Sequence, residues 1–106
     1  MTRVAFKMKL HKGFEDEYKK RHDELWPEME KAMSQRDVNM VIYLYDHLLF
    51  VYATAPSEED WIALDRDPVT PRWDKYMTDV LDDGEDGKTF VNTLPQMFAF
   101  GEFLHT

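Results

Sequence analysis

The sequence predicts a single α+β domain, residues 1–106, in which helices cover one face of an antiparallel sheet. Two observations support the prediction: apolar residues alternate with polar ones along residues 3–10, and they recur with helical spacing along residues 14–34. A third is the order of the predicted segments: strand, helix, strand, strand, helix, strand. The chain has 106 residues, 43% of them hydrophobic, so it is long enough to bury one core.

The first strand is predicted where four apolar residues alternate with Arg3, Ala5, Lys7 and Lys9, and Gly13 ends this pattern. One helix is predicted over residues 14–34, because its apolar side chains fall within an arc of about 100° on a helix. The residues in that arc are Phe14, Tyr18, His22, Leu25, Met29, Ala32 and Met33.

Residues 40–45 and 48–53 are predicted as two strands joined by a tight turn at Asp46 and His47. Ser57 resembles the N-cap of a capping box that opens a short helix, which Asp67 and Pro68 interrupt. Thr70 and Pro71 are predicted to open a further helix. The buried stripe predicted for that helix is Trp73, Tyr76, Met77 and Val80.

An acidic loop over residues 82–87 and a last strand from Gln96 to Phe103 complete the predicted order, which is that of the ferredoxin-like βαββαβ fold. The middle and last strands carry apolar residues on both faces, whereas the predicted helices cover only one. Sheet-to-sheet pairing of two chains is the simplest cover for the second face. The sequence therefore predicts a homodimer of the dimeric α/β barrel type.

The net charge of −8, from 13 basic and 21 acidic residues, argues against nucleic-acid binding. The chain has no Cys, so it can form neither a disulfide nor a thiolate metal site. No apolar run approaches the roughly 18 residues of a membrane span, and the first residues do not resemble a signal peptide, so the cytoplasm is the expected location. The remaining histidines show no metal-binding spacing, and there is no phosphate-binding glycine loop. We therefore expect a neutral small-molecule partner without metal or cofactor.

The candidate site is the group Tyr18, His22 and Trp26, which are four residues apart and share one side of the predicted helix. A titratable imidazole between a phenol and an indole suits a sugar, whose C–H face packs on aromatic rings and whose hydroxyls need polar partners. A core histidine satisfied by one hydrogen bond is the plainer interpretation, and spacing alone leaves both open. Arg21, beside this stripe, is predicted either to hold a substrate hydroxyl or to pair with a glutamate at the surface.

Three blocks of the sequence resemble the L-rhamnose mutarotase family, small dimeric ferredoxin-like enzymes of sugar catabolism. The blocks are residues 5–8, residues 17–28 with the Arg21-His22 and Trp26-Pro27-Glu28 motifs, and residues 72–80. The resemblance covers nearly the whole chain. It implies an isomerase that interconverts the α and β anomers of a free deoxy sugar without a cofactor. L-rhamnose is the first expectation for that sugar, and L-fucose or a related aldose is the alternative.

By this resemblance His22 is the proton donor to the ring oxygen and Tyr18 binds the sugar. Trp73 stacks on the sugar's apolar face. Two positions depart from the family pattern: Met40 replaces a second binding tyrosine, and Asp74 replaces a second tryptophan. Asp74 is a candidate base or hydroxyl acceptor, and a solvent-facing carboxylate is its plainer interpretation. Both departures fall on the expected pocket and leave the preferred sugar open.

Two other functions are compatible with the predicted fold. One is a non-catalytic small-molecule-binding module of the dimeric α/β barrel type, in which His22 is structural. The other is a cofactor-free monooxygenase-like or haem-handling enzyme of the same architecture. The motif match favours the mutarotase over both, because it rests on site chemistry rather than on fold.

Overall fold

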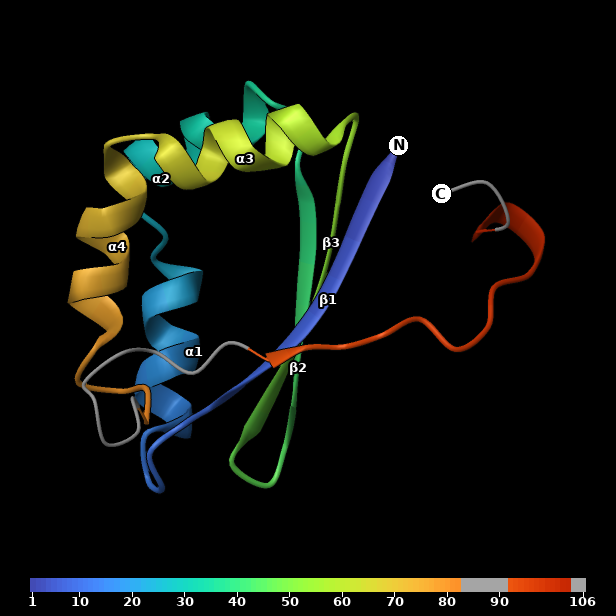
Figure 1. The fold of residues 1–106 in the computed structure, drawn as a ribbon. Helices are drawn as coiled ribbons and strands as arrows, with labels where there is room; N and C mark the ends of the chain where they lie inside the picture. The colour runs from blue at the N-terminus through green and yellow to red at the C-terminus, as the bar shows by residue number, and fades with distance from the viewer. Residues whose placement is uncertain (83–91, 104–106) are drawn as a thin grey trace.

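The computed structural model describes residues 1–82 and 92–103 (Figure 1). Its elements in chain order are β1 (Thr2–Lys9), α1 (Glu15–Asp23), α2 (Pro27–Ser34), β2 (Asn39–Tyr45), β3 (Leu48–Ala55), α3 (Glu58–Arg66), α4 (Val69–Met77), β4 (Asn92–Thr93) and a short 3-10 helix (Gly101–Phe103). None of the helices in these two ranges is long and apolar enough to cross a membrane.

The four strands form one antiparallel sheet in the order β2-β3-β1-β4. This is the strand order of a ferredoxin-like fold and confirms the predicted α+β class. The four helices lie on one side of the sheet, and residues 94–103 extend away on the other side (Figure 1).

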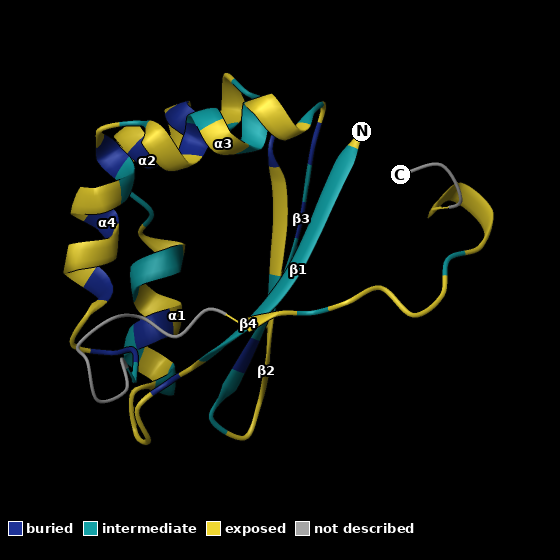
Figure 2. Ribbon diagram, in the orientation of Figure 1, coloured by how far each residue is buried: buried dark blue, intermediate teal, exposed yellow. Residues whose placement is uncertain are grey.

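The core lies between the helices and one face of the sheet (Figure 2). Along β3 every second residue is buried, because successive side chains of a strand point to opposite faces. Val51 is paired with Phe6 of β1 and Ile42 of β2, so these residues share the helix-facing side. Buried side chains from the helices complete the core, including Tyr18, Met29, Ala32, Leu64, Val69, Trp73 and Met77.

Two local predictions are confirmed. Tyr45 pairs with Leu48, so Asp46 and His47 form a two-residue hairpin turn in which Asp46 takes a left-handed φ of 58°. The Ser57 hydroxyl accepts a hydrogen bond from the Asp60 amide at 3.2 Å, as expected for the N-cap of α3. The last long helix, α4, begins at Val69, slightly before the predicted Thr70–Pro71 start.

The single helix predicted over residues 14–34 is wrong, because the structure divides it into α1 and α2. Pro27 takes the first position of α2, where its missing N–H costs nothing. Its ring disfavours helical backbone in the preceding residue, and Trp26 accordingly has an extended ψ of 136°. Trp26 therefore does not continue the helical stripe of Tyr18 and His22.

The last strand predicted from Gln96 to Phe103 is also wrong. Within residues 92–103, Asn92 and Thr93 alone pair with β1, and the Leu94 amide then donates to the carbonyl of Ala5 at 2.8 Å. Pro95 follows, and it has no N–H with which to continue the ladder. Residues 94–103 form an extended segment, here called the C-terminal arm. Of the predicted acidic loop, residues 83–87 lie outside the described residues.

Candidate active site

His22 lies in the last turn of α1 and is partly buried. Its Nδ1 is 3.0 Å from the carbonyl oxygen of Tyr18, one turn earlier. A carbonyl can only accept a hydrogen bond, so Nδ1 carries the proton and donates it. The other ring nitrogen, Nε2, is then the one available to a ligand.

Burial lowers the pKa of the His22 imidazole below its usual 6.5, while the hydrogen bond to the Tyr18 carbonyl and the charge of Asp23 partly oppose this effect. The neutral ring is therefore favoured near neutral pH. With Nδ1 protonated, a neutral imidazole holds its free electron pair on Nε2. In its resting state this atom accepts a proton rather than donating one.

Tyr18 lies directly against the imidazole. The two ring centroids are 4.3 Å apart, and the planes are inclined by 31°. The Tyr18 side chain is buried, and this burial raises the pKa of its phenol far above the usual 10.0. The phenol therefore stays protonated and keeps its capacity to donate a hydrogen bond.

Two indoles complete the group. Trp73 of α4 presents an edge-on contact to His22, with centroids 5.4 Å apart and planes at 90°. Trp26, in the link between α1 and α2, contacts Trp73 in the same manner at 5.1 Å. The structure thus joins Tyr18, His22, Trp73 and Trp26 in one continuous aromatic cluster.

Tyr76 extends this cluster, with its ring 5.1 Å from Trp26 and 5.6 Å from Trp73. It was predicted to be part of the buried stripe of its helix, and this is wrong, because the side chain is 40% exposed. Its contact with Trp26 depends on the position of the link between α1 and α2, which helical periodicity does not describe.

The two residues that depart from the family pattern are placed differently. Met40 lies on β2 opposite the buried Ala53, so it is on the helix-facing side of the sheet, yet it is 39% exposed. Asp74 is exposed on α4, and its pKa is raised by partial burial first and by the charge of Asp65 second. Within residues 1–82 and 92–103, no hydrogen bond or ring contact joins either residue to His22.

No group of three or more acidic or histidine side chains in the described part of the chain is arranged to hold a metal ion. What the cluster offers is an imidazole with one free nitrogen, a neutral phenol and several aromatic surfaces. An arrangement of this kind is chemically suited to a small polar molecule that has apolar faces and can exchange protons with an imidazole.

Comparison with known proteins identifies the particular family. The family model for L-rhamnose mutarotase matches residues 3–100. The chain is 37% identical to an L-rhamnose mutarotase of Burkholderia orbicola and 38% identical to one of Shigella flexneri, in each case over 92% of this chain and 97% of the relative. The crystal structure of L-rhamnose mutarotase from Formosa agariphila has a TM-score of 0.80 and 28% identity, covering 95% of this chain and 100% of that one.

The chain therefore belongs to the L-rhamnose mutarotase family, whose members are isomerases that act on carbohydrates.

Proposed function

We propose that this protein interconverts the α and β anomers of a free deoxy aldose, with His22 as the acid–base group. The observation that supports this most directly is the hydrogen bond from Nδ1 to the Tyr18 carbonyl, which leaves Nε2 free for the sugar. Mutarotation needs only an acid and a base near the anomeric carbon, and an imidazole can serve as both in turn.

The proposed reaction begins when neutral Nε2 takes the proton of the anomeric hydroxyl. The anomeric carbon then forms a carbonyl as its bond to the ring oxygen breaks, and the imidazolium returns the proton to that oxygen. Rotation of the open-chain carbonyl and the reverse steps close the ring on the other face. One proton is moved and returned, so the scheme needs neither metal nor cofactor. It modifies the sequence expectation, because His22 acts first as a base and only then as the proton donor.

In this proposal the aromatic side chains around His22 bind the sugar, while His22 itself transfers the proton. The partly exposed Trp26 and the neighbouring Trp73 are proposed to pack against the C–H side of a sugar ring, and the neutral Tyr18 phenol to donate to one of its hydroxyls. The methyl group of a 6-deoxy sugar enlarges the apolar side that these rings contact. Such a division of roles is what a monosaccharide site requires.

L-rhamnose is the proposed sugar, because the relatives are named as L-rhamnose mutarotases. Met40 and Asp74 are proposed to border the sugar, by their positions in the family pattern. Since Asp74 adds a hydroxyl acceptor where a tryptophan is usual, L-fucose or a related aldose is the alternative.

The test is NMR saturation transfer between the anomeric protons of a panel of aldoses that includes L-rhamnose and L-fucose. We expect the wild type to accelerate anomer exchange of at least one 6-deoxy sugar. A clear preference for L-rhamnose would contradict the alternative that Asp74 shifts the preference to L-fucose or a related aldose. No acceleration with any sugar would contradict the mutarotase proposal and favour a non-catalytic binding module.

We further propose that residues 1–106 act as one domain of a cytoplasmic homodimer. The sheet face away from the helices exposes Tyr43 and Tyr45 of β2 at 67% and 75%. On the C-terminal arm, Met97, Phe98 and Phe100 are also strongly exposed. Large apolar side chains exposed in this number are typical of an interface, and a second copy of the same face would cover them.

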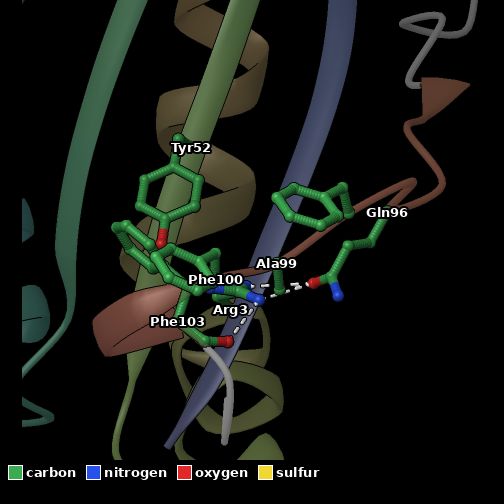
Figure 3. Close-up of a pocket in the computed structure, with 7 residues that line it drawn as sticks. Arg3, Tyr52, Gln96, Ala99, Phe100 and Phe103 are labelled. Atoms are coloured by element: carbon green, nitrogen blue, oxygen red, sulfur yellow. Dashed lines mark hydrogen bonds between the residues drawn. The ribbon is translucent and has the colours of Figure 1, made fainter.

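Side chains of the arm, together with Arg3 and Tyr52, line an open hollow of about 450 Å³ against this sheet face (Figure 3). Arg3 holds the arm there, donating hydrogen bonds to Gln96 Oε1 at 2.6 Å and to the Phe103 carbonyl at 2.9 Å. Because aromatic side chains of the arm line this hollow, the proposed interface includes the arm as well as the strands.

The double variant Tyr43→Glu with Phe98→Glu is expected to be monomeric, because it places two charges among the apolar side chains of this face. Sedimentation velocity should give the wild type twice the chain mass of 12.7 kDa and the variant 12.7 kDa. Ile62→Glu is the matched control, since Ile62 is exposed on α3 at the helix side and the variant should stay dimeric. A wild-type mass of 12.7 kDa at micromolar concentrations would contradict the dimer.

A further inference from the structure

The side chain of Arg21 joins the end of α1 to the end of α4. Its guanidinium donates to both carboxylate oxygens of Asp79, at 2.8 and 3.0 Å, and to the backbone carbonyl of Tyr76 at 2.7 Å. The surface pair with a glutamate that the sequence suggested exists only as a 3.8 Å contact with Glu17. The main partner is Asp79, far away in the sequence.

The same guanidinium lies over the Tyr76 ring, 4.4 Å from its centroid. Only 12% of the Arg21 side chain is exposed, although it carries a charge. A forked, stacked and largely covered arginine holds its partners in one geometry, which a flexible surface ion pair does not do.

A second ion pair between helices provides the comparison. Arg72 of α4 contacts Glu28 of α2, and their side chains are 56% and 65% exposed. Among residues 1–82 and 92–103, that contact is a single pairing without a second acceptor or a ring beneath the guanidinium, and exposed pairs of this kind contribute little. The two arginines therefore differ in geometry, while both connect α4 to a neighbouring helix.

Arg21 directly precedes His22, and its partner Tyr76 belongs to the aromatic cluster of the candidate site. Tyr76 contacts Trp26 and Trp73, and Trp73 presents its edge to the imidazole. The fork joins the end of α4 to the end of α1, and these are the helices that carry Trp73 and His22.

We propose that Arg21 and Asp79 form a positioning clamp, which holds the Trp73 ring against the His22 imidazole for reaction with the sugar. The clamp residues act through Tyr76 and Trp73 and do not touch the substrate. This inference rests on the proposed function of His22. Small displacements of a reacting group can lower rates strongly, by up to about 100-fold for 1 Å.

The test uses Arg21→Lys and Asp79→Asn in the full chain. Lysine keeps the charge but cannot form the fork, and asparagine removes the carboxylate while keeping its size. We expect each variant to lower kcat by about tenfold while KM changes by less than about threefold, since the displaced group acts in the chemical step. Asp79→Glu, which keeps the carboxylate, should recover most of the lost rate.

Arg72→Lys and Glu28→Gln are the matched controls, and their kcat should stay within twofold of the wild type. A second readout is the proton chemical shifts of the His22 ring, which depend on the edge of Trp73. They should move in the Arg21 and Asp79 variants but not in the controls.

The outcomes separate the clamp from the proposed function. If the wild type exchanges no sugar, the proposed function fails, while the His22 shifts still decide whether Arg21 positions Trp73. If the wild type is active but both clamp variants keep their kcat and their His22 shifts, the clamp is overturned. A similar loss in the Arg72 and Glu28 variants would overturn it as well, because the effect would then not be specific to the fork.

Discussion

Replacing His22 by asparagine is expected to lower the enzyme-accelerated rate of anomer exchange by about 10²- to 10⁴-fold, the usual contribution of a positioned acid–base group. The asparagine amide nitrogen can take the place of Nδ1 and still donate to the Tyr18 carbonyl, so the local structure of α1 is retained. What the variant lacks is a titratable atom in the place of Nε2. The measurement is saturation transfer between the anomeric protons of the sugar that the wild type prefers.

His11→Asn is the matched control for this experiment, because His11 is exposed in the loop after β1 and has no part in the aromatic cluster. Its exchange rate should equal that of the wild type. Retention of more than a third of the wild-type rate by His22→Asn would show that another group performs the proton transfers.

The pH dependence of the wild type shows which form of His22 starts the reaction. Burial lowers the pKa of His22 below 6.5, so kcat/KM should be constant near neutral pH and fall only as the pH drops through that lowered value. A rate that instead rises on acidification would assign the imidazolium as the starting acid.

The same shift predicts how His22 contributes to stability. Below pH 6.5 the unfolded chain takes up a proton at His22 more readily than the folded chain does. The contribution of His22 to the free energy of unfolding is therefore complete above pH 6.5 and is lost as the pH falls through the folded-state pKa. Acid unfolding of His22→Asn should lack this component.

Replacing Trp73 by alanine is expected to reduce the free energy of unfolding by about 3–5 kcal/mol, the usual cost of removing a large buried aromatic side chain. Trp73 is buried and contacts His22, Trp26 and Tyr76, so its removal leaves a cavity between α1 and α4. Domains are commonly stable by only about 5–15 kcal/mol, so the variant should unfold at a much lower urea concentration. Far-UV circular dichroism at a fixed protein concentration measures this, since three indoles contribute to the fluorescence.

Trp61→Ala is the control for the Trp73 experiment. Trp61 is a tryptophan of α3 that is only partly buried, and among the described residues it makes no ring contact with the aromatic cluster. The loss should be clearly smaller than that for Trp73. Equal losses in the two variants would mean that Trp73 has no special part in joining the helices.

The pairing of Tyr18 with His22 could be predicted from sequence, because both lie in one short helix and a spacing of four residues places them on one side. The place of Trp26 could not be predicted from the same spacing, since Pro27 ends that regularity. The sequence did contain a sign of this break, because the ring of Pro27 disfavours helical backbone at Trp26. The apolar stripe nevertheless continues beyond Pro27, so periodicity alone predicted one helix. The prediction of a last strand was wrong for a similar reason. Pro95 cannot continue the hydrogen bonds of the sheet, and the apolar residues after it belong to the arm.

Burial on α4 shows the limit of a pattern along one helix. Trp73 and Met77 of α4 and Val80 just beyond it are buried as predicted, whereas Tyr76 remains 40% exposed between Trp26 and the Arg21 guanidinium. Helical spacing predicts the direction in which a side chain points, but it does not predict how far neighbouring elements cover that side chain. The resemblance to the family suggested Trp73 for the site, and its edge-on contact with His22 is a property of the folded chain.

For this protein, the sequence by itself determined the alternation of β1, the hairpin at Asp46, the cap at Ser57 and the Tyr18–His22 pair. All of these depend on residues within a few positions of one another, where backbone geometry alone sets the spacing. Only the tertiary structure decided that Trp73 lies against the imidazole, that Arg21 pairs with Asp79 and that the arm leaves the sheet. These contacts join distant segments, and they depend on how the helices pack on the sheet and on each other.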